Sequence, residues 1–346
     1  MKINILDYIN IKDKCIIFEK LQSYTFINVL IIFILIIVLI QLFLFLRYFI
    51  LFFKKYFFTK ELDLLKKYGS IANQNNNWVL ITGCSSGQGK KIALEFAKRK
   101  FNIILVGSIR IINVEKIIKT NYNVKTHSIV VNFSNAYQKD FFLPIINTLE
   151  NLDGELSILV NNVGHRVAWK PYHEMPSQKI NDSIICGTIV QSRLTKIAIK
   201  HFLQRKSKSC IINITAMCNY SNIWFGEKGD ISIPYLSVYE ASNAFGYYHS
   251  NSIQKEYENI IDILNIIPGA VITENTEYLK NIPFSIDSDT YIQNIFKLIG
   301  NYNGPQYASW KHDLSNILCN FMFFYKDSVL KNTGSIIANN YMENNK

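Results

Sequence analysis

Two different hydrophobic patterns follow one another along the chain. The first is a charge-free apolar run at residues 25–46. Because a helix rises about 1.5 Å per residue, this run covers the roughly 30 Å hydrocarbon layer of a bilayer. It is too long for a cleaved signal peptide, and basic rather than small residues follow it. We therefore expect one N-terminal transmembrane helix with its flank at residues 25–53, after an N-terminal segment at 1–24; a buried core helix is the alternative.

The second pattern begins after an expected basic and polar linker at residues 54–77. Short apolar runs recur there, separated by helix-length stretches such as 90–100 and 180–204. This alternation is typical of parallel strands with crossover helices. The sequence thus predicts an α/β fold in which residues 78–346 form a single domain with a Rossmann-like, doubly wound parallel sheet. Its strands are expected at residues 78–83, 101–107, 127–133, 157–164, 209–215 and 261–269.

A glycine-rich turn ends the first expected strand. It reads TGCSSGQG from Thr82 to Gly89 and leads into an amphipathic helix. Glycines let the backbone turn tightly and approach a pyrophosphate, whose charge is stabilised by free N–H groups and the helix dipole. The turn therefore predicts a dinucleotide site with candidate contacts at Gly83, Ser85, Ser86, Gly87, Gln88 and Gly89.

The spacing of this turn, TGxxxGxG, resembles that of the short-chain dehydrogenase/reductase family. Two further stretches are similar to family motifs, namely NNVG at residues 161–164 and PGAVIT at residues 268–273. The resemblance implies that Asn161 and Gly164 shape a strand end near the adenine and ribose. It also implies that the nicotinamide is bordered by Pro268, Gly269, Val271 and Thr273.

Within that family, the chain is similar to membrane-bound very-long-chain 3-oxoacyl-CoA reductases and the related 17β-hydroxysteroid dehydrogenases. The stretches LLKKYGS, FAKRKFNIILVG and ILVNNVG carry this likeness, together with the N-terminal apolar run. It implies a single-pass protein of the endoplasmic reticulum membrane with a cytosolic C-terminal domain. The implied reaction is reduction of the 3-oxo group of an acyl-CoA in fatty-acid elongation, or of a steroid-type ketone. A homo-oligomer or partners in an elongation complex would be compatible with it.

The residues after the second expected strand bear on the choice of nucleotide. A site for NAD usually carries an acid there for the ribose 2′-hydroxyl, whereas this chain reads VGSIR at residues 106–110. The missing acid and the presence of Arg110 favour NADP(H) over NAD(H), with Arg110 as a solvated surface charge being the alternative. Asn132 stands where the resemblance implies an aspartate that contacts the adenine, and its amide can still accept a hydrogen bond.

The expected catalytic residues depart from the family pattern. The resemblance implies a tyrosine that donates a proton, a serine that orients the substrate, a lysine that holds the ribose and an asparagine that completes a water relay. Tyr239 matches the tyrosine, but Asn243 replaces the lysine, Ala216 the serine and Gly187 the asparagine. Loss of one preorganised group typically costs about 3 to 4 kcal/mol of transition-state stabilisation. Two hypotheses remain: a reductase with divergent catalysis, or a non-catalytic relative that binds nucleotide or partners at the membrane.

Other residues offer substitutes for the missing groups. Thr215 carries a hydroxyl one residue before the empty serine position. An insertion at 218–230 contains Lys228, which could fold over the site, although a solvated loop is the simpler interpretation. His249 is out of phase with Tyr239 on a helix, so we expect a surface or packing residue.

The substrate end of the site is less clear from the sequence. An apolar slot for an acyl chain could be built by Trp224, Phe225, Phe284 and residues 317–325. Residues 317–325 could instead lie against the bilayer as an amphipathic segment. Ordinary core packing explains the same residues equally well.

Charge and cysteine content change this picture little. The net charge of +11 comes without a basic stripe, so nucleic acid is not an expected partner, and attraction to an anionic membrane surface is the simpler consequence. Six scattered cysteines without a CxxC pair fit a reducing compartment, and no metal site is expected. Basic residues are more numerous after the apolar run than before it, which favours a cytosolic C-terminal domain.

Overall fold

The chain divides into two compact units, with the boundary between Phe58 and Thr59. The computed structural model describes residues 11–70, 76–164, 169–216, 233–321, 334–339 and 341.

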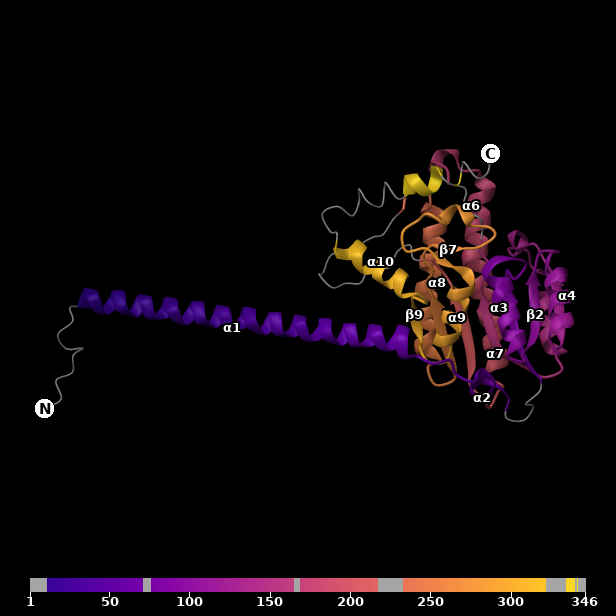
Figure 1. The fold of residues 1–346 in the computed structure, drawn as a ribbon, viewed down its shortest axis with the longest axis horizontal. Helices are drawn as coiled ribbons and strands as arrows, with labels where there is room; N and C mark the ends of the chain where they lie inside the picture. Colours follow the sequence, from indigo (N-terminus) through magenta and orange to yellow (C-terminus); the bar gives the residue numbers. More distant parts are fainter. Residues whose placement is uncertain are drawn as a thin grey trace. The chain divides into compact units, whose positions relative to one another are not determined.

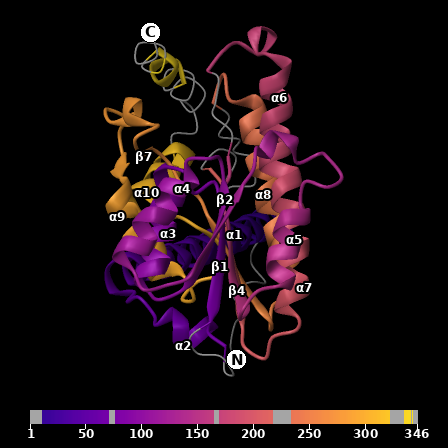
Figure 2. The ribbon, with the colours of Figure 1, turned by 90° about the vertical axis from the view of Figure 1, so that its right-hand side faces the viewer.

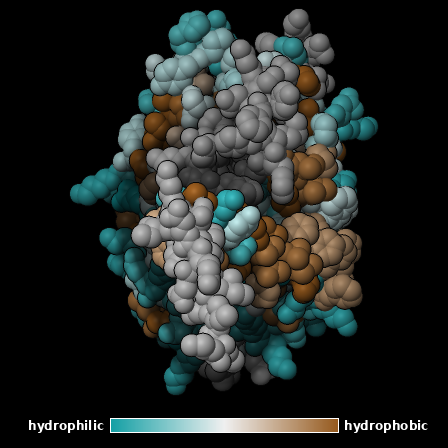
Figure 3. All heavy atoms as spheres, turned by 90° about the vertical axis from the view of Figure 1, so that its left-hand side faces the viewer, coloured by the Kyte–Doolittle hydropathy of each residue, from teal (hydrophilic) through white to brown (hydrophobic). Residues whose placement is uncertain are grey.

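The N-terminal unit is one long helix, α1 (Ile11–Phe53), followed by a π-helical turn, η2 (Lys54–Phe58) (Figure 1). Within Phe18–Phe58 an 18-residue window reaches a mean hydropathy of 3.5 and is 0% buried. By length and composition this helix can cross a membrane. The apolar side chains of this helix are exposed. Figure 3 shows one face of the molecule, on which patches of hydrophobic surface (brown) lie among hydrophilic surface (teal). Because α1 begins before residue 25, part of the expected N-terminal segment is helical.

The second unit is built on a sheet of seven parallel strands in the order β3-β2-β1-β4-β5-β6-β9. The order reverses between β1 and β4, and the crevice at the carboxyl ends of such a pair is where doubly wound sheets bind ligands. The predicted fold class is thereby confirmed. The strands are β1 (Asn77–Thr82), β2 (Asn102–Gly107), β3 (Thr126–Val130), β4 (Glu155–Asn161), β5 (Ser209–Ile214), β6 (Ile261–Ile266) and β9 (Gly304–Gln306).

Helices cover both faces of this sheet because successive strand residues point to opposite sides. Val79 and Ile81 of β1 pack in one core cluster, while Trp78 and Leu80 pack in the other. Figure 2 shows α3 and α4 on one side of the sheet and α5 and α7 on the other. The helices of this unit are α2 (Leu64–Tyr68), α3 (Gly87–Lys98), α4 (Ile111–Asn121), α5 (Leu143–Glu150), α6 (Ser177–Ile184), α7 (Gln191–Phe202), α8 (Ser237–Glu256), α9 (Ser288–Leu298) and α10 (Trp310–Phe321).

Two elements differ from the sequence expectation. The stretch 180–204 is not one α-helix, since the π-helical segment η5 (Ile185–Val190) separates α6 from α7. Strand β9 was not expected, because its three residues include a glycine and a proline. A proline is tolerated there because β9 is an edge strand and needs no second partner.

The expected linker at 54–77 also differs, because its second half packs in the domain. Leu64 and Tyr68 of α2 are buried in the core. The Tyr68 hydroxyl donates to Asp262 Oδ2 at 2.8 Å, and Arg205 Nη2 donates to the Tyr68 carbonyl oxygen at 2.6 Å. The domain therefore begins at Thr59, well before residue 78.

Candidate functional site

The glycine-rich turn lies at the carboxyl end of β1 and opens α3. Gly83 and Gly87 have φ angles of +65° and +56°, in the left-handed region that favours glycine. Ser86, the N-cap residue of α3, makes no side-chain hydrogen bond to the helix. The first N–H groups of α3 thus lack a side-chain cap beside the cavity, and such a helix start binds anions through its N–H groups and dipole.

The turn at residues 161–164 fits directly against the glycine-rich turn. Asn162 Nδ2 donates to the carbonyl oxygens of Thr82 and Gly83 at 3.1 and 3.2 Å. A Cβ atom on Gly89 would overlap both Asn162 Nδ2 and the Gly83 carbonyl oxygen. Glycine at position 89 is therefore required by the close approach of the two turns.

Asn161 and Gly164, in the same turn, serve different purposes. Asn161 is buried and donates through Nδ2 to Asn213 Oδ1 at 2.8 Å, which joins β4 to β5. Its Oδ1 has no hydrogen-bond partner among the described residues. Among the described residues, no atom lies within 4 Å of where a Cβ of Gly164 would be. Asn161 thus holds the strand ends together, whereas Gly164 leaves space open in the cavity.

Two serines and an arginine border the end of β2. Ser85 Oγ and Ser108 Oγ lie 2.9 Å apart, and Arg110 is exposed at the start of α4. All three line the cavity, and no carboxylate does so in the part of the chain that the structure describes. Asn132 is not part of this lining. Its side chain caps the following 3₁₀ turn, η3 (Phe133–Asn135), whose first residue lines the cavity instead.

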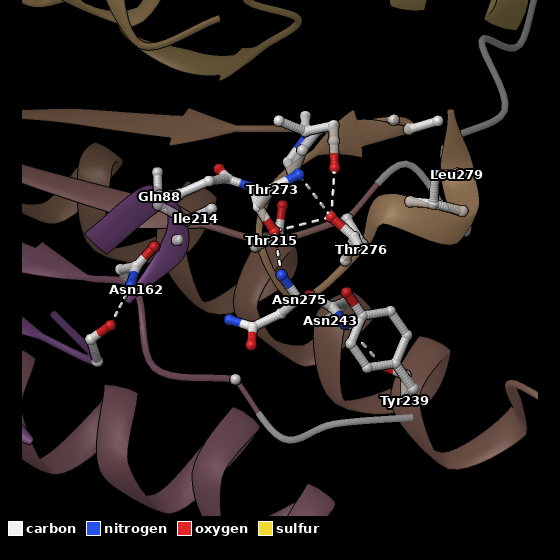
Figure 4. A pocket seen from close by; sticks show the side chains of 18 of the residues that line it. Gln88, Asn162, Ile214, Thr215, Tyr239, Asn243, Thr273, Asn275, Thr276 and Leu279 are labelled. Carbon is white, nitrogen blue, oxygen red and sulfur yellow. Dashed lines mark hydrogen bonds between the residues drawn. The ribbon is translucent and has the colours of Figure 1, made fainter. Parts of the chain in front are cut away.

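The segment after β6 forms the opposite wall of the cavity. Thr276, which the sequence did not single out, donates to the Val271 carbonyl oxygen at 2.7 Å and accepts the N–H of Thr273 at 2.9 Å (Figure 4). Asn275 Nδ2 donates to Ser86 Oγ at 3.0 Å, which joins this wall to the glycine-rich turn. The cavity is lined by all four residues expected at the nicotinamide: Pro268, Gly269, Val271 and Thr273.

His312 of α10 supports the same wall. Its Nδ1 accepts the N–H of Gly269 at 3.1 Å, and its ring centroid lies 5.4 Å from that of Tyr291. A Cβ on Gly269 would lie 2.7 Å from His312 Cδ2, so glycine lets the imidazole reach the backbone. Burial lowers the pKa of His312 to about 4, which keeps the ring neutral near pH 7.

The four positions expected to act in catalysis, residues 187, 216, 239 and 243, are called the catalytic corner below. Two of them lie at the start of α8. Tyr239 and Asn243 are one helical turn apart, and both line the cavity (Figure 4). Asn243 Nδ2 donates to the carbonyl oxygen of Tyr239 at 2.8 Å. No lysine lines the cavity within the described ranges. A neutral amide bonded to its own helix thus occupies the position where the family has a cation.

Helix packing closes the position where the relay asparagine was expected. Gly187 lies in η5, and a Cβ on it would be 2.6 Å from Ser242 Cβ on α8. An asparagine therefore cannot occupy residue 187 unless Ser242 gives way, since interiors are closely packed. Glycine at this position is part of the contact between two helices.

Thr215 and Ala216 lie where a substrate-orienting hydroxyl was expected, and both line the cavity. The Thr215 hydroxyl lies 3.2 Å from Asn265 Oδ1 and 3.1 Å from the Ile266 carbonyl oxygen, and the residue is 5% exposed. It is therefore engaged with β6. Ala216 is 6% exposed and packs in an apolar cluster that includes Trp169.

The remaining candidates lie elsewhere. His249 stacks on Phe245 with ring centroids 5.3 Å apart and does not line the cavity, as its position on the helix suggested. The insertion at 218–230, with Lys228, Trp224 and Phe225, lies outside the described residues. A cluster of side chains suited to a metal ion is not found among the residues that are described.

One cavity of about 870 Å³ joins the glycine-rich turn, the turn at residues 161–164, the segment after β6 and the start of α8. Phe284 lines it as expected, and Leu318 of α10 contributes from the stretch 317–325. Sequence reasoning missed most of the apolar half, because its residues come from segments far apart in the chain. That half is lined by Trp169, Ile233, Leu236, Tyr278, Leu279, Ile282, Pro283, Phe284, Leu318, Ile337 and Tyr341.

Comparison with known proteins agrees with this arrangement. A family profile described as short chain dehydrogenase matches residues 77–282, which is more than half of the chain. The matched region contains the glycine-rich turn, six of the seven strands of the main sheet and Tyr239. The chain belongs to the short chain dehydrogenase family.

Similar proteins include both an enzyme and a relative described as inactive. The chain is 26% identical over 278 residues to the very-long-chain 3-oxoacyl-CoA reductase of Mus musculus, covering 78% of this chain and 83% of the relative. It is also 26% identical over 268 residues to the inactive hydroxysteroid dehydrogenase-like protein 1 of Homo sapiens, covering 75% and 74%. Sequence identity alone therefore does not separate the two hypotheses.

Solved structures show the same fold. A short-chain dehydrogenase from Sphingobium yanoikuyae in complex with NADPH matches with a TM-score of 0.57 and 20% identity, covering 71% of this chain and 95% of that one. A 7β-hydroxysteroid dehydrogenase matches with a TM-score of 0.59 and 18% identity, covering 74% and 93%. At these identities the likeness concerns the fold alone.

Proposed function

We propose that this protein is a membrane-anchored, NADP(H)-binding member of its family that holds an apolar ligand beside the nucleotide and lacks the family's usual proton relay. One contrast within a single cavity carries the proposal. The glycine-rich turn, the turn at 161–164 and the segment at 268–273 are complete and close around the site. The three positions expected to assist Tyr239 hold Gly187, Ala216 and Asn243.

The nucleotide site fits a phosphorylated ribose. The uncapped start of α3 would hold the pyrophosphate, and Gly83 and Gly87 let the backbone approach it. Arg110 with the hydroxyls of Ser85 and Ser108 would meet a 2′-phosphate, while no described carboxylate is present to bind a 2′-hydroxyl. The structure from Sphingobium yanoikuyae, which shares the fold, was solved in complex with NADPH.

The side chains around Tyr239 are poorly suited to the reduction of a carbonyl group. The nucleotide, when bound, supplies a hydride, and a tyrosine is ordinarily protonated at neutral pH and able to donate. Asn243 carries no charge to stabilise the phenolate that would form at Tyr239. Loss of one such preorganised group costs about 3 to 4 kcal/mol, or roughly 10² to 10³ in rate, and Ala216 removes a second group.

A second candidate function is slow reduction of a very-long-chain 3-oxoacyl-CoA or a steroid-type ketone. Two observations favour it: Tyr239 still lines the cavity, and the mouse relative is a very-long-chain 3-oxoacyl-CoA reductase. The apolar half of the cavity suits the hydrocarbon part of either substrate.

We propose a place in the endoplasmic reticulum membrane with the C-terminal domain in the cytosol, as the resemblance to membrane-bound very-long-chain 3-oxoacyl-CoA reductases implies. The exposed apolar helix α1 would be the anchor, crossing the bilayer through residues 25–46. Cys84, Cys186 and Cys210 are buried and free, which fits a reducing compartment.

Nucleotide titration tests the first part of the proposal. The full-length protein in lipid nanodiscs is titrated with NADPH and with NADH, and binding is followed by nicotinamide fluorescence. NADPH should bind more tightly, and Arg110→Ala should weaken NADPH binding about tenfold, a loss of about 1.4 kcal/mol, without changing NADH binding. Failure to bind either nucleotide would overturn the proposal.

Turnover of a long-chain 3-oxoacyl-CoA tests the second part. The parent should consume NADPH at a background rate. A variant with Ala216→Ser, Asn243→Lys and Gly187→Asn should gain activity only if Ser242→Gly is added, because the new asparagine needs the space that Ser242 fills. Turnover by the parent above the background rate, abolished by Tyr239→Phe, would establish the second candidate instead.

A further inference from the structure

The C-terminal segment, described at residues 334–339 and 341, lies against the apolar half of the cavity. Ile337 and Ala338 are 7% and 4% exposed, and Tyr341 packs edge-on against Tyr278 with ring centroids 5.4 Å apart. A Cβ on Gly334 would lie 3.0 Å from Ile233 Cγ2. The C-terminal segment is thus packed closely against two other parts of the domain.

This segment belongs to the same apolar cluster as the catalytic corner. Ile337 and Ala338 share the cluster with Ala216 and Leu236, and the Tyr239 ring packs against it. The methyl group of Ala216, at the expected serine position, therefore contributes to an apolar wall beside Tyr239. Ile337 and Tyr341 also line the cavity directly.

Backbone strain marks the same region. Trp169, Tyr235 and Phe284 have φ angles of +31°, +75° and +63°. Bulky side chains rarely adopt such angles, and strained residues tend to cluster where a ligand must be held. Trp169 and Phe284 line the cavity, and Tyr235 packs against the cluster that closes it.

We propose that residues 334–339 and 341 form the closing wall of the apolar half and that Ile337 and Tyr341 limit how much hydrocarbon fits beside Tyr239. The occupant is the hydrocarbon chain of an acyl thioester. This assignment rests on the proposed function, because it places an apolar ligand next to the nucleotide. Its chemistry follows from the apolar lining together with the similarity to a very-long-chain 3-oxoacyl-CoA reductase.

Two adjacent isoleucines provide a matched pair for the test. Ile337 is 7% exposed and lines the cavity, whereas Ile336 is 52% exposed on the same short helical segment. Ile337→Asp would place a charge in the apolar wall, and Ile336→Asp would place the same charge in solvent. A difference in ligand labelling between the two variants would therefore be due to the charge in the cavity wall, and not to a general effect of aspartate on the helix.

The experiment uses full-length protein in nanodiscs with a stearoyl-CoA analogue that carries a diazirine at the end of its acyl chain. After irradiation, labelled peptides are identified by mass spectrometry. Label is expected on the peptides that contain Tyr278 and Ile337, and free stearoyl-CoA should compete with it. Ile337→Asp should reduce labelling at least fivefold, while Ile336→Asp should stay within twofold of the parent.

Several outcomes would overturn the assignment. Equal labelling of both variants, label confined to other segments, or competition by progesterone but not by stearoyl-CoA would each do so. If Ile337→Asp loses NADPH binding, Ile337→Trp fills the cavity without adding a charge and should reduce labelling to the same extent. NADPH titration of each variant keeps the two proposals distinct, since a parent that is labelled but binds no nucleotide overturns only the proposed function.

Discussion

The two ends of the cavity depart from the family pattern to different degrees. At the nucleotide end, Gly83, Gly87 and Gly89 keep the spacing of the motif, and the neighbouring turn packs directly on them. At the catalytic corner, Tyr239 matches the pattern that the resemblance implies, whereas Gly187, Ala216 and Asn243 do not. The nucleotide end acts through backbone N–H groups and close packing, so a change there disturbs the fold as well as binding. The catalytic corner acts through single side chains, which can be replaced while α8 and η5 stay packed.

The largest expected effect is at the nucleotide end. Gly89→Ala would force a methyl group into Asn162 Nδ2 and the Gly83 carbonyl oxygen. Because the new methyl group would overlap both atoms, one of them backbone, overpacking should still cost about 3 kcal/mol after the better helix propensity of alanine is subtracted. We expect at least a hundredfold weaker NADPH binding in a fluorescence titration and a lower midpoint of urea unfolding.

Gly164→Ala is the matched control for this change. No atom of the described ranges lies within 4 Å of its Cβ position, so the same methyl group meets no steric obstacle from them. The free energy of unfolding should change by less than about 0.5 kcal/mol. Equal losses in both variants would show that the close packing of the two turns is not what the nucleotide end depends on.

A second prediction concerns the wall between the two ends, where His312 is buried. Its pKa is lowered from 6.5 to about 4, so as the pH falls the unfolded chain takes up the proton first. The free energy of unfolding is therefore unaffected by this residue's protonation above about pH 6.5, and it decreases as the pH falls from 6.5 to about 4. The loss amounts to about 3 kcal/mol, at 1.36 kcal/mol per pH unit.

His312→Gln removes this titration and keeps an acceptor for the Gly269 N–H. The fall in unfolding free energy between pH 7 and pH 4, measured by urea unfolding at each pH, should become smaller by about 3 kcal/mol. His173→Gln serves as the control, since the His173 side chain is 81% exposed. An unchanged pH dependence in His312→Gln would show that the wall does not depend on a neutral imidazole.

The smallest effect is expected at the catalytic corner. Gly187→Ala places a Cβ 2.6 Å from Ser242 Cβ, which should cost about 2 kcal/mol of unfolding free energy. Ser242→Gly should relieve most of this cost, and a double-mutant cycle by urea unfolding measures the coupling. Additive effects would contradict the view that residue 187 is glycine because of the neighbouring helix.

Much of the fold could be predicted because its signals are local. Apolar runs marked six of the seven strands of the main sheet, and the glycine spacing marked the turn after β1. Strand β9 could not be found, because Gly304 and Pro305 give no strand signal and pair only through β6. The second half of the expected linker was misassigned for a similar reason, since Tyr68 is held by Asp262 and Arg205 from distant segments.

The candidate site was predictable to a smaller extent. Motif spacing pointed to Tyr239 and to its three altered partners, and the structure places all four around one cavity. Asn132 was expected at the adenine but caps a 3₁₀ turn, because its side chain finds a backbone N–H two residues away. Thr276 and His312 carried no motif, and their roles depend on hydrogen bonds to the segment after β6.

The sequence by itself determined the apolar N-terminal helix, the doubly wound sheet, the nucleotide turn and the absence of a lysine four residues after Tyr239. Each of these depends on residues close together in the chain. Only the tertiary structure decided that the Thr215 hydroxyl is engaged with β6, that Ser242 excludes a side chain at Gly187 and that Ile337 and Tyr341 line the cavity. These features arise from contacts between distant segments, whose geometry the order of residues does not reveal until the chain is folded.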